Sequence, residues 1–384
     1  MSAAGGGPEL LEAGPPPVSP TARRWRLVAV AVAVLLALTV GGLWVRGQEE
    51  RAAGPVSSPS PRSPSSPSPL PVSSTRLPLP TAPVVLRRNG PPIEGLGSGD
   101  LFVRSLDTVY RIGLTTGRVT ATTAAVGMSA PVGFLAGPSE VVLRPLDRVP
   151  GLVVPDDRPA AELRGPLRRA SRLLPATDGQ LWAGRPFDGR SSRLTLYHFD
   201  GTSSGVTVQA NGSFLPDGAG GLLLVDGGGV RELVGPGRRI TTGTVLATGP
   251  HHYLLADCPG GRTCITSRYD RRTRKPVRVP AEQAGLYGGG GTMSGDGRYV
   301  AAMTYGPDGS AVAEVVDLSS GRIVATLAEP NASADITSVA SWSADGRRLV
   351  ALDDGQLVVL DPATGERFTP DLDLPSLFGV ALRS

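Results

Sequence analysis

The sequence predicts an all-β domain carried on one transmembrane helix and a disordered linker. Three observations lead to this prediction: an uncharged apolar run near the N-terminus, a stretch dense in proline and serine behind it, and evenly spaced turns between short β-rich runs from residue 86 onward. The 384 residues include 51 glycines and 37 prolines but only 5% aromatic residues, which favours turns and short strands over helices.

The transmembrane helix is predicted over residues 26–46. Its core, Leu27 to Val45, carries no charge, and nineteen residues at about 1.5 Å each span nearly the hydrocarbon thickness of a bilayer. Trp25 and Trp44 stand where interfacial aromatics belong. The alternative is a cleaved signal peptide, but this apolar run is longer than a typical one and lacks a small-x-small cleavage site.

Positive charge predicts the orientation of this helix. Three arginines lie within four residues on its N-terminal side, Arg23, Arg24 and Arg26, and this bias places residues 1–25 in the cytoplasm as a short disordered tail. The rest of the chain is then extracytoplasmic, at the plasma membrane.

Residues 47–85 form the predicted disordered spacer. Ten of the thirty residues from Gly54 to Pro83 are proline, and serine fills most gaps. Such a segment favours extended polyproline II, which at about 3.1 Å per residue holds the next domain up to about 90 Å from the bilayer.

The domain at residues 86–384 repeats a pattern of short β-rich runs and turns. The first turn of each copy falls near Gly99, Pro138, Asp178, Asp217, Pro250, Asp296 and Asp345. Six intervals therefore cover 246 residues and average 41, the length of a four-stranded propeller blade. We expect a β-propeller of four-stranded blades, seven in preference to six or eight, with a two-sandwich array as the alternative. Ring closure needs a terminal strand, and Val84–Arg87 and Leu377–Leu382 are both candidates.

The clearest copies share two motifs. A Ser-x-Asp-Gly-Arg turn at residues 294–298 and 343–347 precedes an apolar strand, and Asp-x-x-(Ser/Thr)-Gly follows the next strand at 317–321 and 361–365. These motifs resemble the WD40-like and TolB-like propeller repeats of bacterial extracytoplasmic proteins, well over 288–372 and weakly over 86–287. The near-absence of lysine and the alanine, glycine, proline and arginine richness are typical of GC-rich genomes such as those of actinobacteria.

Cys258 and Cys264 are the only cysteines. They flank a Pro-Gly-Gly turn between two apolar runs, so we expect a disulfide across the loop between the second and third strands of the fifth blade. The sharpest charge cluster follows them: Arg271, Arg272, Arg274 and Lys275. It is a candidate site for an anionic wall polymer or lipid headgroup, and a solvated turn is the alternative.

Charge and motifs narrow the function. Seven arginines and four glutamates precede residue 86, so +3 of the net charge of +4 lies outside the domain, and nucleic acid is not an expected partner. The only histidines, His198, His251 and His252, lie in no nucleophile motif. No catalytic, metal-binding or cofactor-binding motif is found, and no cofactor is expected.

The leading hypothesis is a monomeric, membrane-anchored module whose rim or central funnel binds a protein or glycan of the cell envelope. The alternative is a propeller enzyme, a lyase, quinone-dependent dehydrogenase or glycosidase, with residues converging from several blades. A funnel lined by carboxylates with perturbed pKa values, or by several arginines and histidines, favours the enzyme, whereas a bland funnel with an exposed apolar patch on its rim favours binding.

Overall fold

The computed structural model describes residues 81–124, 131–145, 150–177, 179–184, 192–233, 237–258, 264–280, 290–305, 311–328 and 336–383. All of them belong to the compact unit Thr75–Ser384. Within these ranges no helix has the length and apolar character needed to cross a bilayer. The predicted tail, the transmembrane segment Leu27–Val45 and the spacer up to residue 80 lie outside the described residues.

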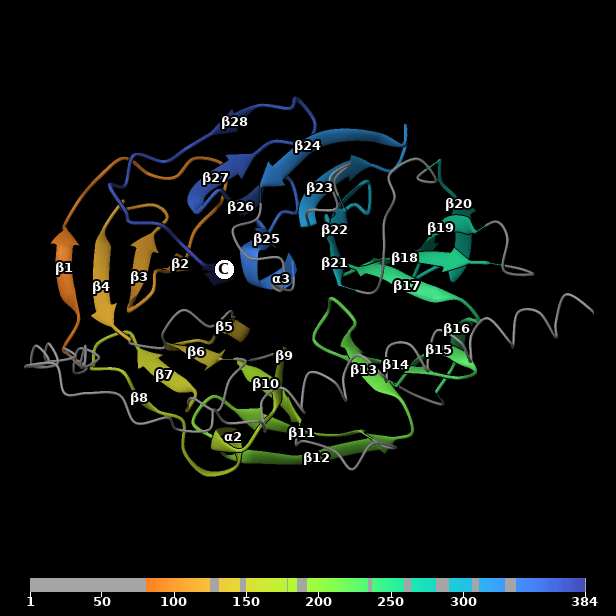
Figure 1. Cartoon of the computed structure of the whole chain (residues 1–384), viewed down its shortest axis with the longest axis horizontal. Coiled ribbons are helices and arrows are strands. Elements are labelled where there is room, and N and C mark those ends of the chain that lie inside the picture. The colour runs from red at the N-terminus through yellow and green to blue at the C-terminus, as the bar shows by residue number, and fades with distance from the viewer. Residues whose placement is uncertain are drawn as a thin grey trace, which may run out of the picture. The chain divides into compact units, whose positions relative to one another are not determined.

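The described strands form a multi-bladed β-propeller, with small sheets arranged around a common centre (Figure 1). The first sheet has five strands in the order β1-β4-β3-β2-β29. Their bounds are β1 Val84–Arg87, β2 Asp100–Arg104, β3 Thr108–Gly113, β4 Val119–Thr123 and β29 Gly379–Arg383. Both terminal candidates for ring closure therefore join one sheet: β29 pairs with β2 on the central side, and β1 pairs with β4 on the outer side.

Four sheets have four antiparallel strands each, paired in chain order. They are β5 Pro131–Ala136, β6 Glu140–Pro145, β7 Leu152–Pro155 and β8 Ala161–Glu162; β9 Arg172–Pro175, β10 Gln180–Gly184, β11 Ser192–His198 and β12 Ser203–Ala210; β13 Ser213–Pro216, β14 Leu222–Asp226, β15 Gly229–Glu232 and β16 Arg239–Thr241; and β25 Ala340–Trp342, β26 Leu349–Asp353, β27 Gln356–Leu360 and β28 Arg367–Phe368. Two one-turn helices, α2 Gly165–Arg168 and α3 Ile336–Val339, precede β9 and β25.

The remaining eight strands form one sheet, in the order β20-β19-β18-β17-β21-β22-β23-β24. Their bounds are β17 Thr244–Thr248, β18 His252–Asp257, β19 Ile265–Asp270, β20 Lys275–Arg278, β21 Gly291–Met293, β22 Tyr299–Tyr305, β23 Ala311–Asp317 and β24 Arg322–Ala328.

The prediction of seven separate blades is wrong as a count of sheets. Five sheets in the described part of the chain have the size of a single blade, and the sixth has eight strands. The physical reason is a parallel pairing of β17 with β21, in which Ala247 lies opposite Gly291 and Thr248 opposite Thr292. This pairing joins two antiparallel groups of four strands into one hydrogen-bonded sheet.

The repeating turns have one structural role. Pro138, Asp217, Pro250, Asp296 and Asp345 all lie between the central strand of a four-strand group and the second strand. The evenly spaced turns of the sequence therefore mark the same end of successive groups around the ring. Asp178, the turn predicted between β9 and β10, lies outside the described residues.

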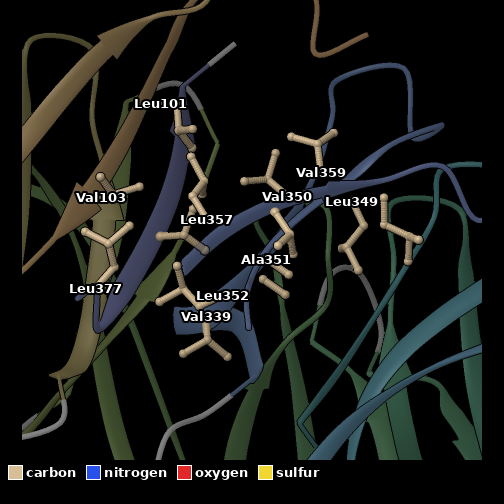
Figure 2. Packing of buried hydrophobic residues seen from close by; sticks show 14 of the residues in the cluster. Leu101, Val103, Val339, Leu349, Val350, Ala351, Leu352, Leu357, Val359 and Leu377 are labelled. Carbon is tan, nitrogen blue, oxygen red and sulfur yellow. The ribbon is translucent and has the colours of Figure 1, made fainter. Parts of the chain in front are cut away.

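Burial decreases from the centre of the ring to its perimeter. Strand β26 is buried on both faces because neighbouring sheets cover it, which explains its uninterrupted run Leu349–Leu352. Figure 2 shows this run packed with Leu101 and Val103 of β2 and with Leu357 and Val359 of β27. The perimeter strand β20 is exposed along its whole length. Short strands suffice because each sheet is buried by its neighbours.

Candidate functional site

A cavity of about 560 Å³ lies among the central strands of the ring. Strands β5, β9, β21, β25 and β29 line it, together with the turns that follow β13 and β17. Its apolar surface includes Phe134, Leu173, Met293 and Trp342. This volume falls within the range of small-molecule and peptide-side-chain pockets, and a concave, mostly apolar site is the usual form of a binding pocket.

The charge on the cavity wall is sparse. Among the described residues that line it, Arg172 is the charged one, and its Nη1 donates a hydrogen bond of 2.9 Å to the carbonyl oxygen of Phe214. The described lining holds no carboxylate and no histidine, so within it no pair of groups can exchange a proton with a substrate. Gln180, Ser341 and Thr248 supply neutral hydrogen-bonding groups.

One mouth of the cavity is built from small residues of the repeating turns. Gly218 and Gly220 lie there because no side chain would fit: a Cβ on Gly218 would meet the backbone of Gly249, and one on Gly220 would meet Thr177. Ala219 and Ala344, in the turns after β13 and β25, are exposed at this mouth. Arg172 is the first residue of β9, at the opposite end of the cavity from these turns.

One ionisable group with a shifted pKa borders the cavity: a hydrogen bond of 2.6 Å from the lining residue Ser343 lowers the pKa of Asp345, which stands between the lining residues Ala344 and Gly346. Burial lowers the pKa of His252, aided by the nearby Arg268, while Asp270, 3.9 Å from its Nε2, opposes the shift. Burial alone raises the pKa of Glu314 on β23. These groups are not gathered into one site, and the described residues contain no cluster of three metal-binding side chains. His198, predicted to be an ordinary strand residue, ends β11.

The predicted disulfide is confirmed. Cys258 and Cys264 are bonded to each other. They lie between β18 and β19, the second and third strands of their four-strand group, which is the loop that the sequence indicated. The bond joins the end of β18 to the start of β19, and neither cysteine lines the central cavity.

The basic cluster divides into two parts. Arg271 is half-buried against the neighbouring sheet: its Nη2 lies 2.6 Å from Asp217 Oδ2, and its guanidinium lies 4.9 Å from the ring centre of Tyr253. Arg272, Arg274 and Lys275 are exposed, and no ion pair or side-chain hydrogen bond involves them within the described part of the chain. The anion-binding role of the cluster remains a prediction for these three residues.

The cavity residues were missed by the sequence analysis. Arg172, Ala219, Trp342 and Ala344 come from three different sheets, and each stands in an ordinary strand or turn context. The only available indication was the turn spacing itself, since it places small residues at one end of each central strand.

Comparisons with known proteins show similarity of architecture alone. No family model and no curated protein matches the chain. Solved structures with similar folds include TolB from Acinetobacter baumannii, with 14% identity and a TM-score of 0.39 over 76% of this chain and 68% of that one. Dihydro-heme d1 dehydrogenase NirN has 15% identity and a TM-score of 0.39 over 77% of this chain and 68% of that one. Similarities at this level carry no argument about function.

Proposed function

We propose that this protein is a non-catalytic binding module, anchored in the plasma membrane, whose central cavity holds part of a protein or glycan of the cell envelope. The composition of the cavity wall carries the proposal. A mostly apolar surface with neutral hydrogen-bonding groups and one guanidinium can bind, but its described residues offer no acid–base pair for hydrolysis or elimination. The uncharged run Leu27–Val45 and the proline-rich spacer support the anchored, extracytoplasmic placement.

The topology is tested by adding protease to intact cells. We expect residues 86–384 to be degraded from outside, because the arginine bias predicts an extracytoplasmic domain. Immunoblotting with tags at both ends measures this: the C-terminal tag disappears while an N-terminal tag on the cytoplasmic tail persists. A C-terminal tag that survives until the membrane is permeabilised would contradict the orientation.

Blocking the cavity mouth tests the binding role. Ala219→Trp combined with Ala344→Trp places two indoles where exposed methyl groups now border the opening. We expect crosslinking of the full chain in intact cells, followed by mass spectrometry, to recover its envelope partner at least tenfold less from this variant, about 1.4 kcal/mol of binding free energy.

The matched control is Ala363→Trp, which adds an indole to the exposed turn between β27 and β28, away from the cavity lining. Equal recovery from both variants would exclude the cavity as the binding site. Turnover of an envelope polymer by the purified chain, abolished by the same cavity variant, would instead establish the enzyme alternative.

A further inference from the structure

The turn from the third to the fourth strand has the same backbone hydrogen bond in four places. The donor N–H belongs to Gly117, Arg274, Gly321 and Gly365, and the acceptor is the carbonyl oxygen four residues earlier, at 2.7 to 2.9 Å. Each donor residue has a positive φ: 57° at Gly117, 61° at Arg274, 72° at Gly321 and 77° at Gly365. The four turns can therefore be compared position by position. The donor residue is arginine in one of them and glycine in the other three.

Arginine is strained at this position, because a side chain crowds the backbone when φ is positive. At Gly117 and Gly321 a Cβ would also clash with the backbone of Gly90 and Pro280, so Gly365 is the position that isolates the effect of conformation. A Cβ at Gly365 would meet no atom within 4 Å, so glycine is favoured there for its backbone freedom and not for lack of space. Arg274 therefore places a guanidinium on the surface at the expense of local backbone strain.

The rest of this turn differs in charge from its three counterparts. Four of the five residues from 271 to 275 are cations, whereas residues 114–118 and 318–322 each contain one cation and residues 362–366 contain none. The same backbone turn is therefore made elsewhere in this chain with mostly neutral side chains. The backbone geometry does not require the positive charge.

Three of the four cations in this turn have no carboxylate partner among the described residues. Asp217 is occupied by Arg271 at 2.6 Å. Asp270 caps the turn, because its Oδ1 accepts the backbone N–H of Thr273 at 2.7 Å. Arg272, Arg274 and Lys275 consequently project like charges from one tight hairpin without an acidic partner among the described residues. Like charges on such an exposed tip repel each other weakly in water, and a bound anion would relieve that repulsion.

We propose that Arg272, Arg274 and Lys275 form a binding site for the phosphate or carboxylate groups of a linear anionic polymer. Guanidinium groups bind both oxyanions through paired hydrogen bonds, and a polymer presents several to one narrow tip. The turn carries no apolar side chain that would enter a bilayer interface, so a chain-like polyanion fits it better than a lipid surface. This site lies on the perimeter and is independent of the central cavity.

Long-chain polyphosphate and polyglutamate are the probes, tested by fluorescence anisotropy on the full chain in nanodiscs of zwitterionic lipid. We expect binding that weakens as salt is added, and an affinity at least tenfold lower for the triple variant Arg272→Gln, Arg274→Gly and Lys275→Gln. The charge-matched control replaces Arg118, Arg322 and Arg347 with glutamine; all three are exposed outside this turn. Equal loss in the control would overturn the proposal.

Two further readouts separate binding from a structural role. Lys275 is the only lysine in the chain, so polyphosphate should protect it from acetylation, as measured by mass spectrometry. Arg274→Gly alone should raise the melting temperature and at the same time weaken polyphosphate binding several-fold, because it removes strain and a charge together. Unchanged affinity in this variant, an unprotected Lys275, or binding only to nanodiscs containing anionic lipid would each overturn the proposal.

Discussion

Replacing Arg383 with methionine is expected to lower the free energy of unfolding by about 3 kcal/mol. Two partly buried carboxylates would keep Arg111 as their one cation among the described residues, and two backbone carbonyls would lose a donor. Arg383 Nη2 lies 2.6 Å from Asp100 Oδ2 and 2.8 Å from Asp156 Oδ2. Its Nη1 donates to the carbonyl oxygens of Gly137 and Pro138. Arg383 therefore fastens the C-terminal strand β29 to its own sheet and to the next one.

The loss of unfolding free energy in the Arg383→Met variant should become smaller as the pH falls. Burial alone would raise the pKa of Asp100, but hydrogen bonds from Arg111 and Arg383 outweigh it and hold the pKa below its ordinary value. A carboxyl with a lowered pKa in the folded state stabilises the fold above its unfolded pKa, and this contribution disappears as pH falls through the folded pKa. The difference between the Arg383→Met variant and the unaltered chain should therefore be full near neutral pH and should shrink below about pH 4.

Denaturant unfolding followed by tryptophan fluorescence from pH 3 to pH 8 measures this effect on the Thr75–Ser384 unit. Arg118→Met is the control, since it removes an exposed arginine in the same sheet and should change the free energy of unfolding by no more than about 0.5 kcal/mol. Arg383→Lys should restore part of the loss, because an ammonium keeps the charge but not the paired hydrogen bonds. If Arg383→Met and Arg118→Met lower the free energy of unfolding by similar amounts, the stability of the ring does not depend on the contacts of Arg383 with Asp100 and Asp156.

Local sequence features predicted the propeller well. Five of the seven predicted turns lie between the first and second strands of a described group, and the Cys258–Cys264 loop was assigned to the correct pair of strands. These features depend on residues close together in the chain: turn chemistry fixes a hairpin, and a hairpin fixes its own register.

Features that depend on distant residues could not be predicted. The merging of eight strands into one sheet requires Ala247 to lie opposite Gly291, and neither residue has a local pattern that indicates a parallel partner. The cavity also depends on distant residues. Arg172 and Trp342 line the same cavity only because the ring closes. Closure itself uses β29, which pairs with β2 at the central edge of the first sheet, whereas β1 adds a strand at the outer edge of the same sheet. The sequence left the two segments as alternatives because both have the same β-rich character.

The basic cluster shows the same limit at the scale of one residue. Arg271 and Arg272 are adjacent and chemically identical, and alternation of side chains along a strand does not apply within a turn. What separates them is Asp217, a buried carboxylate fifty-four residues earlier in the chain. It draws Arg271 inward, and Arg271 Nη1 also donates hydrogen bonds to the carbonyl oxygens of Asp217 and Pro250.

Replacing Arg271 with methionine should therefore lower the free energy of unfolding by about 3 kcal/mol or more, because Asp217 would remain buried without a cation. The side chain of Asp217 is only 4% exposed, and the loop backbone already occupies its other oxygen through the N–H groups of Ala219 and Gly221. Arg272→Met, one residue along, should change stability by no more than about 0.5 kcal/mol.

A double-mutant cycle with Asp217→Asn isolates the contact in the same denaturant unfolding experiment. If the ion pair fastens the two sheets, the combined variant Asp217→Asn with Arg271→Met should lose less than the sum of the two single losses, with a coupling of at least about 1 kcal/mol. Additive losses would mean that Arg271 acts through its stacking on Tyr253 and its carbonyl contacts instead. A coupling between Asp217 and Arg271 would also explain why the guanidinium of Arg271 is not available to an external anion. The side chains of Arg272, Arg274 and Lys275 in the same turn are exposed.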